Sequence, residues 1–299
     1  ISTYLEKSEK NRKKNVNLFH IFVYIALIAL AISIIVPVGW VFMASIKENA
    51  EFYGNPWALP KGFYFQNFIN AFTKAKMGDY LLNSVIVTSL ALVILLAVAL
   101  PASYVLARYS FKFKKLIKTM YMAGLFINVN YIVVPIFLML LDWEDALYSM
   151  FHIEFFLNNI FVLAVVYAAT AIPFTIYLLT GYFQTLPKAY EEAFYIDGAT
   201  YTQTMVKVMI PMARPSIITV ILFNFLSFWN EYIIALTLLP GSSKTLPVGL
   251  MNLSQAARGK AEYGTLYAGL VIVMLPTLIL YCMVQKKLTQ GMTVGGIKD

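Results

Sequence analysis

The sequence is poor in cysteine, histidine and charge, and each shortage excludes a class of protein. One cysteine among 299 residues, Cys282, excludes a disulfide framework and any CxxC metal or redox site. The two histidines, His20 and His152, lie far apart in the chain and indicate no metal centre. Only 13% of the residues are charged, against about 25% in an ordinary soluble domain. Because so few charges cannot cover a soluble surface of this size, the composition predicts a membrane protein.

Long apolar stretches separate the charged segments. Six of them are long enough to cross a membrane: Leu18–Ser45, Leu81–Ala107, Leu116–Leu141, Asn159–Tyr182, Ser216–Leu239 and Gly264–Val284. The first follows a basic run, as in a signal peptide, but its apolar core is too long and no small-residue cleavage site follows. We therefore expect an all-α membrane protein with six transmembrane helices. Residues 1–17 form a basic N-terminus, 18–284 the membrane domain and 285–299 a C-terminal tail.

The basic residues predict how these spans are oriented. With a cytoplasmic N-terminus, 16 of the 23 Lys and Arg residues fall in cytoplasmic segments and seven fall outside. The loop after the third span carries four acidic residues and no Lys or Arg. The positive-inside rule then predicts a multi-pass protein of the cell (inner, cytoplasmic) membrane with both termini in the cytoplasm. Because cytoplasmic loops account for the net charge of +8, we expect membrane lipid and no nucleic acid as a partner.

The chain shows no energy source of its own. Gly241–Thr245 resembles a phosphate-binding loop, but it lacks the glycine before the lysine and lies in an outer loop. The sequence contains no GxSxG, HExxH or clustered carboxylate pattern, so we expect no catalytic residue, no metal and no cofactor bound by this chain. Glu231 is essentially the one ionisable residue inside a span, which gives an ion-coupled secondary transporter little support without excluding it. The pattern favours a conduit that another protein drives.

The predicted cytoplasmic loop of residues 183–215 carries the most specific signal. Thr185, two residues before a proline, predicts the start of a helix. Gly198 predicts the end of that helix, and a second short helix is expected from about Thr200 to before Pro211. An amphipathic hairpin lying on the membrane surface is the alternative interpretation.

This loop resembles the EAA signature of binding-protein-dependent ABC importer permeases. That signature is Glu-Ala-Ala, three residues, Gly, nine residues and Ile-x-Leu-Pro. Here Glu192-Ala193-Phe194 is followed by three residues and Gly198, and nine residues then lead to Val208-Met209-Ile210-Pro211. The spacing is fully kept, and the three departures from the pattern are all apolar.

Further segments are similar to the carbohydrate branch of this family, close to the G-type permease subunit of maltose importers. They are Asp197-Gly198-Ala199, Trp229-Asn230-Glu231 and the ending Gly291–Lys298. The resemblance covers most of the chain and implies a type I ABC importer permease fold, with residues 183–215 as the coupling loop.

The same resemblance implies a set of partners. They are a second permease subunit in a heterodimer, two ABC ATPase subunits that hold ATP and Mg²⁺, and an extracellular solute-binding protein that delivers a sugar or oligosaccharide. Because the ATPase subunits would hydrolyse ATP, this chain is not expected to be an enzyme. The outer segments 47–80 and 240–263 are expected to contact the solute-binding protein.

The resemblance also assigns residues for coupling to the ATPases. They are Glu191, Glu192, Ala193, Phe194, Asp197, Gly198 and Pro211. Glu192 occupies the motif position and is expected to pair with a basic group in the ATPase, while Ala193, Phe194 and Ile196 supply apolar contact. A solvated glutamate without a partner is the alternative for Glu192.

Candidates for a sugar path are polar or aromatic residues at membrane depth. They are Asn128, Asn130, Asn224, Trp229, Asn230 and Glu231. Sugars need hydrogen-bonding groups and an aromatic face on which to stack. These side chains could instead hold helices together, and in maltose-type systems the other permease makes most sugar contacts. An ABC permease for a polyamine, amino acid or phosphate is the alternative within the class.

Overall fold

In the computed structural model the described part of the chain is helical and contains no strand. The backbone is described for residues 2–53, 55–260 and 262–294, and the side chains of residues 2–18, 260 and 286–294 are not described. The elements are α1 Ser2–Ser45, η1 Asn49–Phe52, α2 Gln66–Thr73, α3 Met77–Arg108, α4 Lys114–Gly124, α5 Val129–Phe151, α6 Ile160–Thr185, α7 Ala189–Ile196, α8 Tyr201–Thr204, the π-helix η2 Met205–Met209, α9 Ile210–Met212, α10 Arg214–Asn230, α11 Ile233–Leu238, α12 Leu246–Lys260 and α13 Tyr263–Val294. The prediction of an all-α fold is confirmed.

Four described helices are each long and apolar enough to cross a membrane. They are α1 from Phe19, α3, α6 and α13 as far as Gln285. Two helix pairs would each make one bent span, α4 with α5 at 103° and Tyr201–Met212 with α10 at 73°. The number of candidate spans is therefore four, or six if each bent pair crosses once. The predicted tail begins as a continuation of α13, and its side chains from residue 286 on lie outside the described residues.

The third and fifth predicted spans are each divided into two helices. Leu116–Leu141 is divided between α4 and α5, and the Asn128 side chain caps α5 by accepting a hydrogen bond from the Asn130 N–H at 3.0 Å. Ser216–Leu239 is divided at Glu231, whose backbone is extended with ψ 129°. Hydropathy averages over such breaks, because a single capping residue hardly changes the mean of a long window.

The centre of the bundle is formed by α3 and α6, which are close neighbours over much of their length. Small residues on both helices, Ala91, Ala99, Ala164 and Ala168, are at most 2% exposed. Small side chains let two backbones approach closely inside a membrane. Asn224 of α10 is joined to this core, since its Nδ2 donates to Thr175 Oγ1 of α6 at 3.0 Å.

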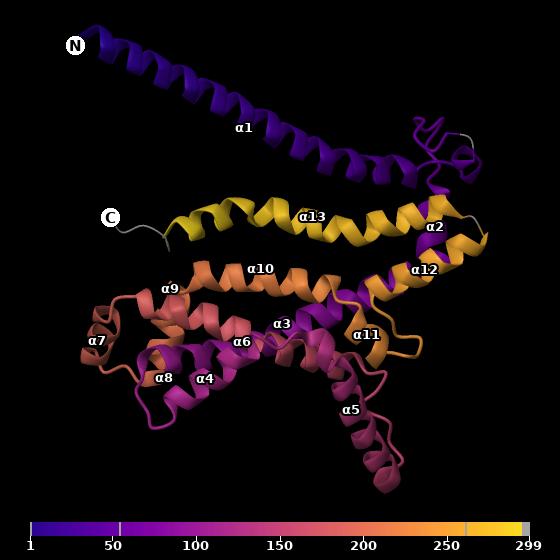
Figure 1. Cartoon of the computed structure of the whole chain (residues 1–299). Helices are drawn as coiled ribbons and strands as arrows, with labels where there is room; N and C mark the ends of the chain where they lie inside the picture. Colours follow the sequence, from indigo (N-terminus) through magenta and orange to yellow (C-terminus); the bar gives the residue numbers. More distant parts are fainter. Residues whose placement is uncertain (1, 54, 261, 295–299) are drawn as a thin grey trace.

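Near its N-terminal end, α3 binds the segment that leads into α12 (Figure 1). Asn83 Nδ2 donates to the Lys244 carbonyl at 3.0 Å, and Ser84 Oγ accepts from the Leu246 N–H at 2.7 Å. This end of the bundle, opposite α7, also contains η1, α2 and α11. The two outer segments expected from the sequence, 47–80 and 240–263, are thus partly helical.

Much of α1 lies apart from the other helices (Figure 1). Phe22 and Ile35 are 68% and 66% exposed, whereas Trp40 near the end of α1 packs edge-on against Tyr267 of α13 at 4.9 Å. An apolar surface of this extent must be covered by lipid or by another protein. The first turns of α1 and the last turns of α13 lie on the same side of the molecule as α7.

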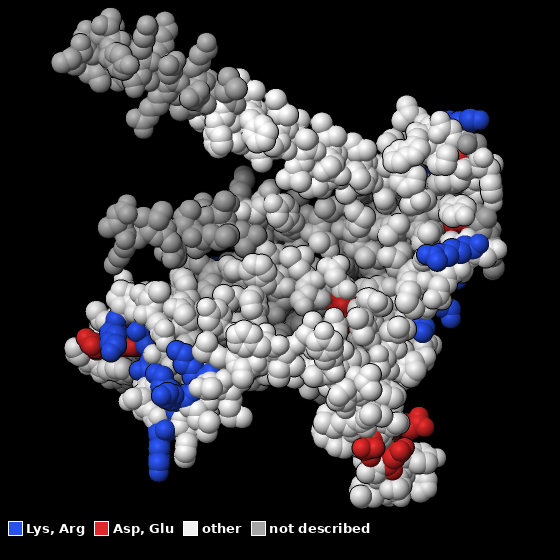
Figure 2. Space-filling model, viewed as in Figure 1, with Lys and Arg blue, Asp and Glu red and all other residues white. Residues whose placement is uncertain are grey.

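One basic and one acidic patch stand out on the surface, and further basic side chains lie at the end of the molecule opposite α7 (Figure 2). Basic side chains gather at the end of the molecule that carries α4 and α7, where Lys112, Lys114, Lys115 and Lys118 lie between α3 and α5 in the sequence. Acidic side chains gather on the free half of α5, which carries Asp142, Glu144 and Asp145. The basic segment before α5 and the acidic half of α5 thus form two separate patches.

Candidate coupling loop and substrate path

The loop between α6 and α10 is built from short helices whose ends follow local rules. Leu186 is extended with ψ 137°, as a residue before proline prefers, so α6 ends at Thr185. The expectation that Thr185 starts the next helix is wrong. Thr185 Oγ1 donates back to the Tyr182 carbonyl within α6 at 2.7 Å, and α7 begins two residues after Pro187.

Gly198 ends α7 in the left-handed conformation, with φ +79°. The Gly198 N–H donates to the Tyr195 carbonyl and the Ala199 N–H donates to the Phe194 carbonyl, both at 3.0 Å. These two bonds form a Schellman motif, in which glycine avoids the steric cost of a Cβ. The sequence prediction of a glycine stop at this position is confirmed.

The second helix of the loop starts as expected but continues farther. Thr200 caps α8, since its side chain accepts from the Gln203 N–H and Gln203 accepts from the Thr200 N–H. The expectation that this helix ends before Pro211 is wrong, because the wide π turn of Met205–Met209 precedes Pro211 and lets the helix continue into α9. Proline has no N–H to donate, and π turns and prolines are both places where helices bend.

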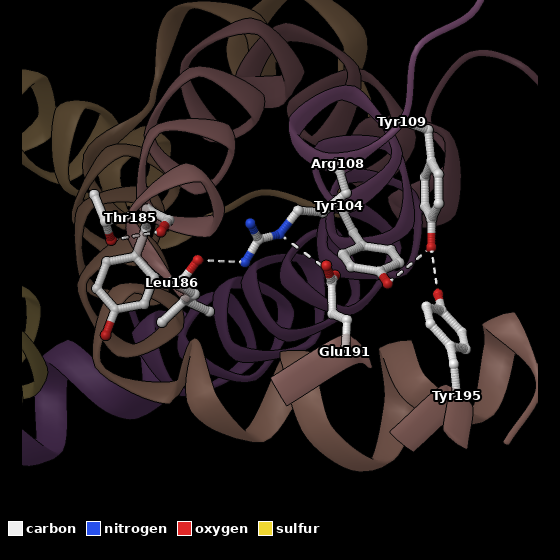
Figure 3. Close-up of polar contacts among 8 residues, drawn as sticks. Tyr104, Arg108, Tyr109, Thr185, Leu186, Glu191 and Tyr195 are labelled. Atoms are coloured by element: carbon white, nitrogen blue, oxygen red, sulfur yellow. Dashed lines mark hydrogen bonds and ion pairs between the residues drawn. The ribbon is translucent and has the colours of Figure 1, made fainter. Parts of the chain in front are cut away.

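The start of α7 is attached to the end of α3 by an ion pair (Figure 3). Arg108, the last residue of α3, places its Nε 3.4 Å from Glu191 Oε1, and its terminal NH₂ donates to the Leu186 carbonyl at 2.6 Å. The side chains of Arg108 and Glu191 are only 5% and 11% exposed. An uncompensated charge at such a site is costly, so each of these residues depends on the other.

A chain of tyrosine hydroxyls makes a second attachment beside the ion pair (Figure 3). Tyr104 and Tyr109 of the α3 end are 3.0 Å apart at their hydroxyls, and Tyr109 is 2.8 Å from the hydroxyl of Tyr195 in α7. Tyr201 of α8 packs its ring 4.2 Å from that of Tyr109. Burial and these hydrogen bonds raise the pKa of Tyr109 far above its ordinary value, so its hydroxyl stays protonated.

The predicted coupling residues divide into an inner and an outer group. Glu191 is buried against Arg108, whereas Glu192, Ala193 and Asp197 are exposed and Phe194 is half-buried. Ile196 is 85% exposed. An exposed carboxylate beside exposed apolar groups on a short helix is a surface suited to a protein partner.

The predicted substrate-path residues do not converge on one site. Asn224 and Trp229 are buried, and the Trp229 Nε1 donates to the Val273 carbonyl at 3.1 Å. Glu231 accepts from the N–H groups of Ile234 and Ala235 at 2.8 and 3.1 Å and from the Tyr167 hydroxyl at 2.7 Å. These three side chains therefore serve internal contacts. The remaining candidates, Asn128, Asn130 and Asn230, are exposed.

Known proteins resemble this chain both in sequence and in fold. The model of the binding-protein-dependent transport system inner membrane component family matches residues 99–293, about two thirds of the chain, including the whole loop described above. The chain belongs to this family. The matched region of the permease begins inside α3 and so leaves out α1.

Named relatives match the permease over nearly all of its length. The diacetylchitobiose uptake system permease protein of Streptomyces coelicolor is 35% identical over 270 residues, covering 90% of this chain and 86% of its own. The trehalose/maltose transport system permease protein of Thermococcus litoralis is 28% identical, with 93% and 96% covered. A crystal structure of a bacterial ABC transporter involved in alginate import has a chain with the same fold, at a TM-score of 0.76 and 24% identity, with 90% and 96% covered.

Sequence reasoning missed the residues that attach the candidate coupling loop of the permease to α3. Arg108 was counted only as a loop charge, and Tyr104, Tyr109 and Tyr195 were not singled out. Glu191 and Arg108 are 83 positions apart in the sequence, so no local pattern could pair them. The available signal was the pair of adjacent glutamates, Glu191 and Glu192. Two adjacent residues of a helix point in different directions, so one of the two carboxylates had to face the rest of the protein and needed a partner there.

Proposed function

We propose that this permease is one of two membrane subunits of an ATP-driven ABC importer that translocates a sugar or oligosaccharide. The names of its relatives, a diacetylchitobiose permease and a trehalose/maltose permease, support a carbohydrate substrate. An extracellular solute-binding protein would deliver the sugar, and two ATPase subunits would hold ATP and Mg²⁺. A polyamine, amino acid or phosphate is the alternative substrate class.

The observation that carries this proposal is the double attachment of α7 to α3. In the proposed cycle the ATPases dock on α7 through Glu192, Ala193, Phe194 and Ile196, and they move together when ATP binds. Because Glu191 and the tyrosine hydroxyls tie α7 to α3, the movement of α7 displaces a span instead of bending a free loop. This is rigid-body switching between an outward-open and an inward-open state.

The test of this function is transport by the assembled complex in proteoliposomes, with the partner permease, ATPases and binding protein included. A panel of N,N′-diacetylchitobiose, maltose, trehalose, spermidine, glutamate and phosphate separates the substrate classes. Uptake of a sugar that requires both ATP and binding protein is the expected result. Sugar uptake driven by an ion gradient without the ATPases would contradict the proposal and favour a secondary transporter.

We further propose that the α7 end of the molecule faces the cytoplasm, because the basic patch, the start of α1 and the end of α13 lie on that side. In a Cys282→Ser chain, Asp145→Cys is expected to react with an impermeant maleimide added to intact cells, and Lys115→Cys is expected not to react. Asp145 and Lys115 are both exposed, so access to the side chain does not differ between them. Labelling of Lys115→Cys from outside, at the rate of Asp145→Cys, would reverse the orientation.

A further inference from the structure

A pocket of about 470 Å³ lies where α10 ends, between α12 and α13 and at the end of the bundle opposite α7. Small-molecule sites typically occupy about 300–1,000 Å³. The wall is mostly aliphatic, with Leu250 and Met251 from α12 and Leu266 and Leu270 from α13. The volume of the pocket therefore falls within the range of small-molecule sites, and its lining comes from the end of α10, from α12 and from α13.

Three polar side chains face this apolar wall. They are Asn230, Tyr232 and Ser254. The Asn230 amide donates to the Leu226 carbonyl at 2.8 Å, which leaves its Oδ1 as an acceptor. Among the residues that the structure describes, the hydroxyls of Tyr232 and Ser254 have no hydrogen-bond partner, and the Tyr232 side chain is 43% exposed. A ligand could therefore use an amide oxygen, two hydroxyls and an aromatic ring.

The break at Glu231 fixes the positions of Asn230 and Tyr232, which lie on either side of it. The Glu231 carboxylate accepts two N–H groups at the start of α11 and the Tyr167 hydroxyl, so the residues on either side of it have a defined direction. Asn230 is the last residue of α10, and Tyr232 directly precedes α11. Glu231 is in this way a positioning residue for the pocket and is itself absent from the lining.

We propose that this pocket is a carbohydrate subsite that binds a neutral pyranose ring on its way through the permease. The proposal rests on the sugar-importing function proposed above. A pyranose ring has apolar C–H faces, which suit the Tyr232 ring and the aliphatic wall, and a rim of hydroxyls, which suit the amide and hydroxyl groups. The described lining carries no charged side chain, so it does not suit a polyamine, an amino acid or phosphate.

The test uses the complete transporter in proteoliposomes and whichever of N,N′-diacetylchitobiose, maltose or trehalose the unaltered complex imports. Tyr232→Ala is expected to lower the maximal uptake rate at least tenfold, while Tyr232→Phe keeps the ring and most of the rate. Tyr281→Ala, an exposed tyrosine of α13 outside the pocket, is the matched control and should leave uptake unchanged. Stimulation of ATP hydrolysis by the loaded binding protein should persist in all three variants.

A binding readout completes the test. Ser254→Cys in a Cys282→Ser chain is expected to react with maleimide several-fold more slowly when the imported sugar is present at saturation. Wild-type uptake by Tyr232→Ala together with no protection of Ser254→Cys would overturn the subsite, although the importer itself would stand. Loss of the partner permease from the Tyr232→Ala complex would also overturn it and would assign the pocket to the subunit interface. Import of no sugar by the unaltered complex would instead remove the proposed function on which the subsite rests.

Discussion

Gly198→Val is expected to leave the protein in the membrane at near-normal abundance but to abolish ATP hydrolysis stimulated by the binding protein. The structure gives a residue with a Cβ open space at this position, with no atom within 4 Å. The cost is therefore in the backbone, because φ +79° costs a residue with a Cβ roughly 1–2 kcal/mol and a β-branched residue more. The chain can relieve this strain by opening the Schellman turn. An open turn changes the direction of α7 and therefore the positions of Glu192 and Phe194. Co-purification of the ATPase measures the loss of docking.

Two further variants separate this backbone effect from simple bulk. Gly198→Asn should keep partial function, since asparagine tolerates the left-handed conformation better than valine does. Gly181→Val makes the same change inside α6, where the added Cβ also meets nothing within 4 Å and φ is helical, and it should keep normal coupling. Full transport by Gly198→Val, or its disappearance from the membrane, would refute the role assigned to this turn.

Arg108→Ala is expected to uncouple the transporter from within the chain, without altering the exposed face of α7 that is proposed to meet the ATPase. It leaves the Glu191 carboxylate buried and unpaired, at a cost of about 3 kcal/mol, and it removes the bond to the Leu186 carbonyl. The segment from Leu186 to Thr200 should then become sensitive to proteinase K, and stimulated ATP hydrolysis should fall at least tenfold. Lys115→Ala, which removes an exposed cation from the same basic patch, should change neither measurement.

The neighbouring glutamates should differ in the same two measurements. Glu191→Ala is expected to behave like Arg108→Ala, because it breaks the same pair. Glu192→Ala should keep the protease resistance of the loop and lose ATPase binding, because its side chain is exposed. The double variant Arg108→Glu, Glu191→Arg should regain part of the protease resistance. Equal protease sensitivity of the Glu191 and Glu192 variants would contradict the division of α7 into inner and outer faces.

Local rules explain which parts of the fold could be predicted from the sequence. Long apolar runs located α1, α3, α6 and α13, because membrane burial requires their length and composition. The breaks near Asn128 and at Glu231 could not be located, since a single polar residue in an apolar run reads equally well as a tolerated helix residue or as a cap. The structure distinguishes the two cases, because the Asn128 and Glu231 side chains each accept a hydrogen bond from a backbone N–H at the start of the following helix.

The geometry of the loop between α6 and α10 was more predictable than the contacts of the sugar-path candidates, for a physical reason. Gly198 acts through its own backbone, and its position relative to Glu192 and Pro211 is fixed by short helices, so sequence spacing carries the information. The sugar-path candidates were chosen by residue type alone, and several of them, such as Asn224 with Thr175, found partners on distant helices. Tyr232 and Ser254 were overlooked because they converge only when α12 folds back beside α10 and α13.

The length of α3 has a thermodynamic consequence for regulation. This one 32-residue helix, about 48 Å long at 1.5 Å per residue, holds the coupling loop through Arg108 at one end and the segment before α12 through Asn83 and Ser84 at the other. Suppose that nucleotide binding to the complex changes the affinity of the α12 end for a ligand. Thermodynamic linkage then requires that ligand to change the affinity of the complex for nucleotide by the same factor. If a loaded binding protein contacts the α12 end, roughly 37 Å from Arg108 along α3 at 1.5 Å per residue, it would raise the affinity of the complex for ATP, and bound ATP would raise the affinity for the binding protein by the same factor.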